Sequence, residues 1–281
     1  MAKVKSNEEL AASRNKAAEK PAPAKAVKKQ VAEKPQWIQD LHIGPSNLPP
    51  RICIYGGHGI GKSTIGAMFP SAIFINTEDG LDAIDCVSFP VPKVAEDIAD
   101  QIRILIKQEH KFKTVVIDTV DWLIDPLITR DIEGSHDDKE LGYGRGSVMI
   151  AEAFREILNG LDILRRRRGM NVVLLAHAEV KRFDSPLTEP YDRYVPKLTK
   201  KSNAILQEWV DVLCYVGYRV IVKKTEAGFG KKVSRGVSTG KRVMHFQEEP
   251  GFLAKARYPE TPESCKMSYD ALKEAIPKIK E

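Results

Sequence analysis

The sequence lacks any hydrophobic run long enough to cross a membrane. A membrane-spanning helix needs about 20 consecutive apolar residues, and no apolar stretch in this chain of 281 residues approaches that length. The first residues also lack the apolar core that is typical of a secretory signal peptide. These absences argue against a membrane protein or a membrane partner and predict a cytoplasmic protein.

Cysteine is scarce as well. The chain has four, none of them in a CxxC pair or near histidines at zinc-ligand spacing: Cys53, Cys86, Cys214 and Cys265. Neither a disulfide framework nor a structural zinc site is therefore expected. We expect reduced thiols, most of them buried.

Aromatic residues are absent before Trp37. A segment without large apolar side chains buries too little surface to offset the entropy of ordering. Most of the formal net charge of +6 also arises in this lysine-rich segment. We therefore predict a disordered basic tail over residues 1–36, with an arm that binds nucleic acid or a partner as the alternative. The core is expected over 37–258, including a lead-in segment, and a C-terminal helical extension over 259–281.

From residue 51 onward, short apolar runs alternate with longer helical patterns. Strands are predicted at 51–55, 72–76, 114–118, 171–177 and 211–222, and helices at 94–109, 147–165 and 268–279, the last with Ser268 as N-cap. Strands that are apolar on both faces and separated by helices indicate a mostly parallel, twisted sheet covered on both sides. The fold class is thus α/β, with an antiparallel extension after residue 215.

The stretch "GGHGIGKST" follows the first predicted strand and precedes a helical pattern. It fits the phosphate-loop pattern GxxxxGK[ST], and its candidate nucleotide-binding residues are Gly56, Gly57, His58, Gly59, Ile60, Gly61, Lys62, Ser63 and Thr64. Glycines let backbone N–H groups curl around phosphate, Lys62 reaches the β- and γ-phosphates, and Ser63 binds Mg²⁺. ATP and Mg²⁺ are the expected cofactors.

A magnesium nucleotide also needs a carboxylate at a strand end. "TVVIDT" supplies Asp118, the usual form of the Walker B element. The next residue is Thr119 rather than a glutamate, so the group that activates water must come from elsewhere. Glu78, in "AIFINTEDGLDAID", follows the neighbouring predicted strand and is the candidate, with a solvated loop acid or a helix N-cap as the alternative.

Residues 72–85 resemble the segment that carries the catalytic glutamate of RecA-like recombinases, and the resemblance implies that Glu78 is the general base. His177, at the end of "NVVLLAH", matches the position of the polar residue that senses the γ-phosphate in RecA-like proteins, commonly glutamine; a structural strand-end histidine is the alternative. Lys255 and Arg257 are similar to the KxR pair that RecA-like and DnaB-like ATPases insert into a neighbour's ATP site, the alternative being solvated charges on an edge strand.

Two segments fall where RecA-like proteins place their DNA-facing loops. Residues 131–147 are glycine-rich and predicted to form no regular structure. Residues 181–202 interleave cations with aromatic rings, a composition suited to single strands because cations track phosphates and rings stack on bases. The candidate DNA-binding residues are Lys181, Arg182, Phe183, Arg193, Tyr194 and Lys197. A third basic run, 165–168, ends a predicted helix, where cations interact favourably with the negative end of the helix dipole.

About residues 50–258 resemble the compact, phage-encoded RecA-like ATP-binding proteins of the single-strand annealing recombinase family. The resemblance implies a Mg²⁺-dependent ATPase that binds single-stranded DNA and promotes annealing during recombination. It also implies a homo-oligomer with ATP at the subunit boundary and a possible single-strand-binding protein as partner. The alternatives are an ATP-driven DNA motor or loader of the DnaB or AAA+ type, and a phosphate-loop kinase or nucleotide-gated regulator without DNA activity.

Overall fold

The computed structural model describes residue 44, residues 46–226 and residues 232–281. The chain divides into two units, residues 1–46 and residues 47–281, and the account below concerns the second. The predicted tail over 1–36 and most of the lead-in segment lie outside the described residues.

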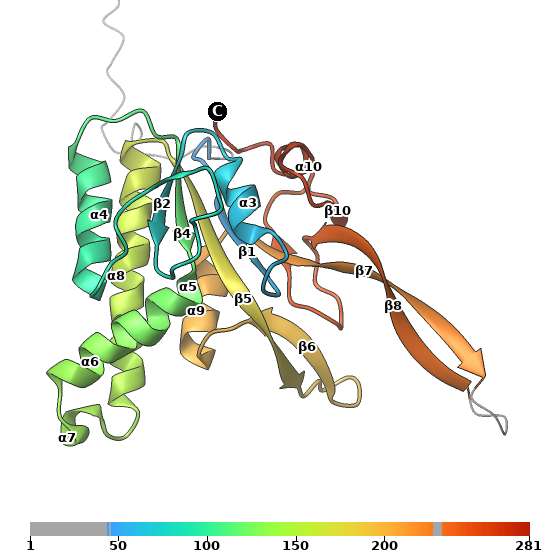
Figure 1. The fold of residues 1–281 in the computed structure, drawn as a ribbon. Coiled ribbons are helices and arrows are strands. Elements are labelled where there is room, and N and C mark those ends of the chain that lie inside the picture. The colour runs from blue at the N-terminus through green and yellow to red at the C-terminus, as the bar shows by residue number, and fades with distance from the viewer. Residues whose placement is uncertain (1–43, 45, 227–231) are drawn as a thin grey trace, which may run out of the picture. The chain divides into compact units, whose positions relative to one another are not determined.

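A mixed sheet forms the centre of residues 47–281 (Figure 1). Its strand order is β10-β8-β7-β1-β5-β4-β2-β3, with β6 added to β5 and β9 to β7. The pairs from β3 across to β7 are parallel; β8 pairs with β7, and β10 with β8, in the antiparallel sense. The predicted α/β class, with an antiparallel C-terminal extension, is confirmed. The strands are β1 (Arg51–Gly56), β2 (Ala72–Asn76), β3 (Val87–Ser88), β4 (Thr114–Asp118), β5 (Asn171–Phe183), β6 (Tyr191–Pro196), β7 (Val212–Glu226), β8 (Lys232–His245), β9 (Lys255–Ala256) and β10 (Ser264–Lys266).

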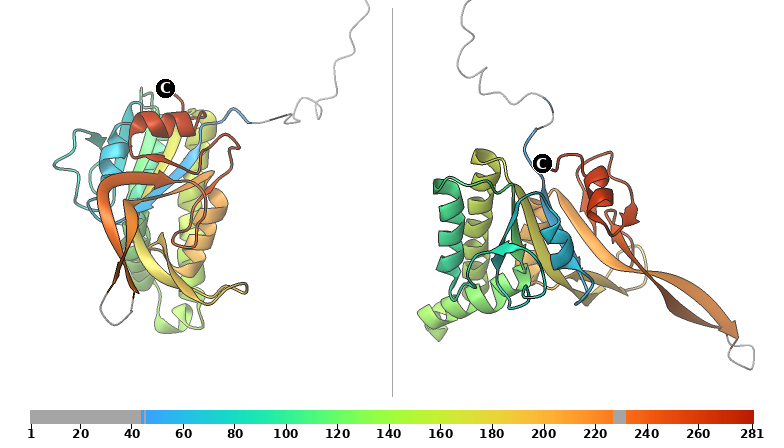
Figure 2. Two further views of the ribbon diagram at one scale, coloured as in Figure 1. Left: turned by 90° about the vertical axis from the view of Figure 1, so that its right-hand side faces the viewer. Right: turned by 45° about the horizontal axis from the view of Figure 1, so that its top comes forward.

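Helices cover both faces of this sheet (Figure 2). One face packs against α4, η1, α8 and α9, and the other against α3 and α10. No helix among the described residues is long and apolar enough to cross a membrane. The helices are α3 (Lys62–Ala67), α4 (Ala95–Lys107), α5 (Val120–Trp122), η1 (Leu123–Ile128), α6 (Thr129–Ser135), α7 (Asp138–Leu141), α8 (Arg145–Arg167), α9 (Lys200–Trp209) and α10 (Tyr269–Ala275).

The two layers explain why the central strands are apolar at every position. Successive side chains of a strand point to opposite faces, and in β1 Cys53 and Tyr55 pack with α4 and α8, whereas Ile52 and Ile54 pack with α3 and α10. All four side chains are fully buried. A sheet with both faces covered therefore needs no polar alternation in its inner strands.

Residues 131–147 are helical, so the expectation of an irregular loop there is wrong. The segment holds most of α6, all of α7 and the start of α8. Asp137 caps α7 by accepting from the backbone N–H of Glu140, and the Glu140 side chain accepts from the N–H of Asp137. Gly144 takes a positive φ of 78° at the start of α8, which is where glycine is favoured. Gly142 and Gly144 thus mark the end of α7 and the start of α8.

Residues 181–202 are not a loop either. β5 continues to Phe183 and pairs with β6 in an antiparallel hairpin, with Lys181 opposite Arg193 and Phe183 opposite Tyr191, and α9 begins at Lys200. We call this β5–β6 element the basic hairpin. Cross-strand contacts stabilise it, since the Arg193 guanidinium lies 3.8 Å from the centre of the Phe183 ring.

Residues 259–281 belong to the same compact unit as the core. β10 pairs with β8, and Leu272 and Ile276 of the C-terminal segment are fully buried beneath α3 and the sheet. The predicted N-cap is confirmed, because the Ser268 hydroxyl accepts a hydrogen bond from the N–H of Ala271. This segment therefore packs into the same core as the strands before it.

A buried carboxylate anchors the end of the sheet opposite the phosphate loop. Asp211 accepts from Arg51 through the backbone N–H at 3.0 Å and through Nη2 at 2.8 Å. The guanidinium groups of Arg165 and Arg257 lie 3.4 and 3.1 Å from the same carboxylate. Burial alone would raise the pKa of Asp211, but the hydrogen bonds from Arg51 outweigh it and lower the pKa. Arg165, taken from sequence as a helix-terminal cation, is thus part of a buried ion cluster.

We expect Asp211→Ala to lower the free energy of unfolding by about 3–5 kcal/mol, because the buried guanidinium of Arg165 loses its ion pair and Arg51 keeps only its pair with Asp162. Glu109→Ala is the control: it removes the partner of Arg168, but Glu109 is 95% exposed, and exposed pairs contribute about 0–1 kcal/mol. Urea denaturation of both variants measures the difference. Equal costs for the two substitutions would contradict the anchoring role of Asp211.

Candidate functional site

The phosphate loop connects β1 to α3, as its sequence predicts. Gly61 adopts a φ of 99° at the start of α3, a conformation that favours glycine. Gly56 is constrained by space instead, because a Cβ at this position would lie 2.6 Å from the carbonyl oxygen of Val216 in β7. The two signature glycines are therefore required for different physical reasons.

Lys62 lies over its own loop. Its Nζ donates to the carbonyl oxygens of Gly56 and Gly57 at 3.2 and 3.1 Å, and the residue is only 6% exposed. Burial lowers the pKa of Lys62, against the opposing effect of Asp118, Asp121 and Glu78. The loop thus holds its cation among three carboxylates, in position to meet phosphate oxygens.

Asp118 and Ser63 lie together at the end of β4. Burial raises the pKa of the Asp118 carboxyl, and a hydrogen bond with the Ser63 hydroxyl opposes the shift. Within the described residues, Oδ1 of Asp118 is buried without a hydrogen-bond partner. An unsatisfied carboxylate oxygen beside a hydroxyl is the donor chemistry that Mg²⁺ prefers, so these two residues fit the ion. No cluster of three histidine, cysteine or acidic side chains suited to a metal occurs in the described part of the chain, as expected for an ion that shares its ligands with phosphate and water.

Thr77 holds Glu78 close to Asp118. The Thr77 N–H donates to the Asp118 carbonyl at 2.8 Å, while its hydroxyl donates to the Thr119 carbonyl at 2.7 Å and accepts from the Thr119 N–H at 2.8 Å. Burial raises the pKa of Glu78, and the carboxylates of Asp118 and Asp121 add to the rise, whereas His177 and Lys62 oppose it. A carboxyl with a raised pKa is a better proton acceptor once ionised.

His177 is held by Asp121, a residue that no sequence pattern singled out. The Asp121 carboxylate accepts from the His177 backbone N–H at 2.9 Å and from ring Nδ1 at 2.8 Å. Since a carboxylate only accepts, Nδ1 carries the proton and Nε2 is left to meet a ligand. The His177 ring also stacks on His58 of the phosphate loop, with centroids 3.8 Å apart. His177, predicted to end its strand, instead lies within β5. Its tautomer is fixed by Asp121, and its ring touches the phosphate loop.

These groups surround one cavity of about 290 Å³. Its lining comes from the phosphate loop, the segment after β2, the end of β4 and the middle of β5. The residues are His58, Gly59, Gly61, Lys62, Ser63, Thr64, Glu78, Gly80, Ile84, Asp118, Thr119 and His177. Most of the residues predicted to bind or hydrolyse a nucleotide therefore meet in one place.

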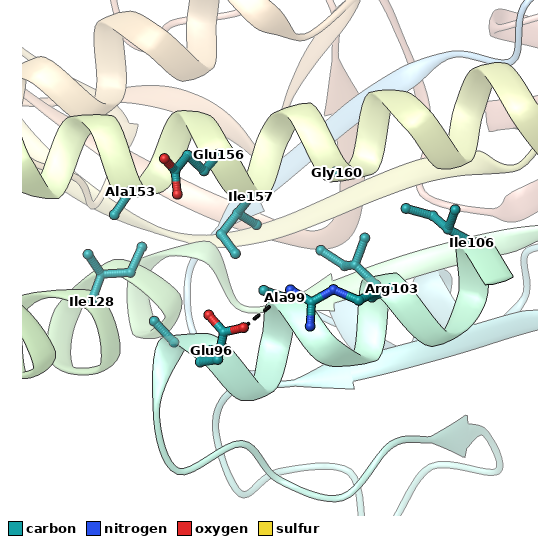
Figure 3. A pocket seen from close by; sticks show the side chains of 11 residues that line it. Glu96, Ala99, Arg103, Ile106, Ile128, Ala153, Glu156, Ile157 and Gly160 are labelled. Atoms are coloured by element: carbon teal, nitrogen blue, oxygen red, sulfur yellow. Dashed lines mark hydrogen bonds and ion pairs between the residues drawn. The ribbon is translucent and has the colours of Figure 1, made fainter.

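A second cavity, of about 420 Å³, lies between α4 and α8 (Figure 3). Isoleucine and alanine side chains line much of it, and its Arg103 is paired with Glu96 at 3.2 Å. Gly160 marks the close approach of the two helices, because a Cβ there would lie 3.1 Å from the Ile102 side chain. None of the residues that line this groove belongs to the phosphate loop or to the segments after β2 and β4 that surround the first cavity.

The candidate DNA-binding residues divide between the two faces of the basic hairpin. Side chains alternate along a strand, so Lys181, Phe183 and Arg193 share one face and Arg182 and Tyr194 the other, with Lys197 just past the end of β6. Arg193 is also paired with Glu248 at 2.6 Å. The hairpin thus brings the predicted residues near one another without placing them on one surface.

A third cavity, of about 440 Å³, lies at the root of the basic hairpin. Lys181 and Lys197 line it together with Trp122, which is 42% exposed, and Asp121. Trp122 was missed from sequence because it sits in an apolar stretch after β4, where a core position is the usual interpretation. Asp121 links this cavity to His177 and the phosphate loop.

Lys255 and Arg257 lie away from the nucleotide cavity of their own chain. Lys255 is paired across from Leu213 at the start of β7, and its Nζ donates to the Gln207 carbonyl. Arg257 contacts Asp211 at the end of the sheet opposite the phosphate loop. A role in a neighbour's site remains a prediction.

Comparison with known proteins gives one family match. The model of a family described as an AAA domain matches residues 48–258. No curated protein matches the chain. Among solved structures, the crystal structure of the RadB recombinase is similar, with 16% identity, coverage of 70% of this chain and 81% of that chain, and a TM-score of 0.39.

We expect Asp121→Asn to lower the free energy of unfolding at pH 7 by about 1–3 kcal/mol, because the two hydrogen bonds from His177 lose their charged acceptor. Burial would raise the pKa of Asp121, but these hydrogen bonds lower it below the ordinary 3.8. The stabilisation is therefore complete above pH 3.8 and disappears as pH falls through the lowered pKa.

The gap between wild type and Asp121→Asn should accordingly narrow in denaturation curves taken from pH 7 down to pH 3. Asp125→Asn, at an exposed position of the same segment, serves as the control and should change stability little at any pH. A gap that stayed constant with pH would show that the Asp121 charge has no part in the effect.

Proposed function

This chain belongs to the AAA domain family, and from that premise we propose that it is a Mg²⁺-dependent ATPase that binds single-stranded DNA and promotes strand annealing in phage homologous recombination. The observation that carries the ATPase part is the single cavity in which Lys62, Ser63, Asp118 and Glu78 meet. The DNA part is supported by the basic hairpin, which joins that cavity through Asp121 and His177.

The phosphate loop would bind ATP through its backbone N–H groups and Lys62. Ser63 and Asp118 would hold Mg²⁺, which in such sites neutralises the charge that develops on the phosphates. A bound Mg²⁺ nucleotide would also give these buried groups stronger partners. At present Lys62 donates only to loop carbonyls, and one oxygen of Asp118 has no hydrogen-bond partner among the described residues. Thr64 and the loop glycines complete the binding set.

Glu78 is proposed as the general base. Its position, set by the hydrogen bonds of Thr77, faces the same cavity as the end of the phosphate loop. The carboxylate would accept a proton from water as the water attacks, and burial keeps that carboxylate basic. His177, oriented by Asp121, is proposed to detect the γ-phosphate through Nε2.

Single-stranded DNA is proposed to bind at the root and faces of the basic hairpin. Lys197 offers charge to phosphates beside Trp122, whose exposed ring suits base stacking. Lys181, now paired with Glu179 at 2.7 Å, would exchange that partner for a phosphate. Arg182, Phe183, Arg193 and Tyr194 extend this surface along both faces. Because Asp121 borders this cavity and holds His177, a strand bound here would be linked to the nucleotide site.

The proposed working form is a homo-oligomer with ATP at the subunit boundary. Lys255 and Arg257 would then serve a neighbour's site, where a cation in trans stabilises transition-state charge. Arg257 has the exposure to do so, since 47% of its side chain is exposed while it contacts Asp211. A single-strand-binding protein is the proposed protein partner.

Glu78→Gln should retain ATP binding and lose turnover, with kcat reduced by about 100-fold or more, because the amide cannot accept the proton. Fluorescent-nucleotide titration measures binding, and phosphate release measures turnover. Asp79→Asn is the matched control, since it neutralises the adjacent, exposed acid and should hydrolyse ATP like wild type. Lys62→Ala should fail at the binding step. A Glu78→Gln protein with wild-type turnover would refute the assignment.

Removing Lys181 and Lys197 together should weaken binding of a single-stranded oligonucleotide. The slope of log K against log salt should become shallower by about 0.7 for each phosphate that the protein no longer neutralises. Lys111→Ala with Lys113→Ala makes the same change in net charge at exposed sites before β4, and should leave the slope unaltered.

ATP hydrolysis with and without single-stranded DNA decides between DNA-linked and DNA-independent roles for this site. Faster turnover with DNA, and tighter DNA binding with a non-hydrolysable ATP analogue, are the expected results. An ATPase that ignores DNA in both assays would instead be a nucleotide-gated regulator or kinase.

A further inference from the structure

β7 and β8 continue past the sheet as a two-stranded ribbon (Figures 1 and 2). β1 pairs with β7 only over Val212–Val216, and β10 pairs with β8 only over Val243–His245. Within the described residues, the ladder from Val220 to Glu226 on β7 and from Lys232 to Ser238 on β8 joins these two strands to each other alone. We call this ladder the arm. Residues 227–231, which connect its strands, are outside the described residues.

Both faces of the arm are open near its base. Val220 and Ile221 are neighbours in β7 and so point to opposite faces, yet they are 56% and 51% exposed. An isolated two-stranded ribbon is marginally stable in water. An extended ribbon with apolar side chains open on both faces is therefore expected to have a binding partner that covers it.

Positive charge dominates this part of the chain. Residues 217–226 and 232–243 contain seven cationic residues and a single acid, Glu226. The register places Lys223 opposite Arg235 and Lys224 opposite Ser234. The cationic residues are Arg219, Lys223, Lys224, Lys232, Arg235, Lys241 and Arg242. Such a charge density matches a polyanion, and the nucleic acid proposed above is the polyanion that this protein meets.

The shape of the arm favours duplex over single-stranded DNA. A two-stranded β-ribbon fits the major groove of B-DNA, which is about 12 Å wide. Unpaired bases need aromatic platforms, and the described arm residues, 220–226 and 232–238, include no aromatic residue. The arm would thus contact the phosphates and the walls of the groove, whereas the aromatic rings of the basic hairpin would stack on unpaired bases.

The base of the arm touches the phosphate loop. A bulge interrupts the ladder between Tyr218 and Val220, where Gly240 takes a φ of 72° and the Thr239 hydroxyl donates to the Arg219 carbonyl at 2.9 Å. A bulge of this kind bends a ribbon and changes its direction. Immediately beyond it, Arg242 donates from Nη1 to the carbonyl of Ile60 at 2.9 Å. The arm is therefore attached at the nucleotide site rather than at a remote edge.

From these observations we infer that the arm is a second nucleic-acid contact, which holds duplex DNA through its phosphates while the basic hairpin holds single strands. The inference rests on the proposed function for its choice of ligand. A protein that anneals strands would by this arrangement retain the duplex that it produces.

The test is binding of a short DNA duplex to Lys223→Ala, Lys224→Ala, Arg235→Ala, combined in one variant. Affinity at low salt should fall by about tenfold or more, and the salt slope should become shallower by about 0.9 for each phosphate that the arm no longer neutralises. The same duplex and the same salt series are used with wild type, and fluorescence anisotropy gives both quantities.

Two control variants make the result specific. Lys107→Ala, Lys111→Ala, Lys113→Ala also removes three cations, all from exposed positions away from the arm, and should bind duplex like wild type. Lys223→Arg with Lys224→Arg keeps the charge and should retain binding if phosphate contact is what matters. Circular dichroism and ATP turnover check that each variant is folded.

Three results would overturn the inference. Unchanged duplex affinity and salt slope in the arm variant would do so, as would an equal loss in the Lys107, Lys111 and Lys113 variant, which would indicate net charge alone. A changed oligomeric state in light scattering, with duplex binding intact, would assign the arm to contacts between copies of the chain.

This test separates the arm from the proposed function. If the arm inference alone is wrong, the arm variant binds duplex like wild type while DNA-stimulated turnover persists. If the proposed function alone is wrong, single-stranded DNA fails to stimulate wild-type turnover while the arm variant still shows its loss of duplex affinity.

Discussion

The parallel register of four neighbouring strands is the constraint on which the candidate site depends. Gly56 at the end of β1 lies opposite His177 in β5, and Asp118 at the end of β4 lies opposite Asn76 in β2. Because neighbouring parallel strands run in the same direction, Glu78 after β2, Asp118 at the end of β4 and His177 within β5 arrive beside the phosphate loop that follows β1. A shift of one residue in any of these pairs would turn the site residues toward the opposite face of the sheet.

That convergence has an electrostatic cost. Glu78, Asp118 and Asp121 are withdrawn from water within reach of one another, and burial acts on each to raise its pKa. Hydrogen bonding decides the direction of each pKa shift. Asp121 accepts two hydrogen bonds from His177 and has a lowered pKa, whereas the pKa values of Glu78 and Asp118 remain raised. This difference suits two roles for similar carboxylates: Asp121 holds a histidine, and Glu78 is proposed to accept a proton.

Two separate parts of the chain touch the phosphate loop from outside it. His177 stacks on His58 and leads into the basic hairpin, and Arg242 donates to Ile60 and leads into the arm. Each contact joins a segment that we propose to bind nucleic acid to the residues that we propose to surround ATP. Coupling between two binding sites requires a structural element whose conformation both ligands change. The contacts of His177 with His58 and of Arg242 with Ile60 would connect nucleotide binding to such elements.

The sequence by itself determined the bounds of β2 and β4, the phosphate loop and the candidates Lys62, Ser63, Glu78 and Asp118, because glycine spacing and a carboxylate after an apolar run are local signals. The end predicted for β5 at His177 is wrong, since the strand continues to Phe183. The helices of 131–147 and the hairpin of 181–202 were not predicted from the sequence. Capping by Asp137 and pairing of β5 with β6 depend on neighbours that composition does not reveal. Only the tertiary structure placed Asp121 against His177, 56 residues away, and Arg242 against Ile60, 182 residues away. Such contacts depend on which strands are neighbours in the folded sheet, and the order of residues along the chain does not specify those neighbours.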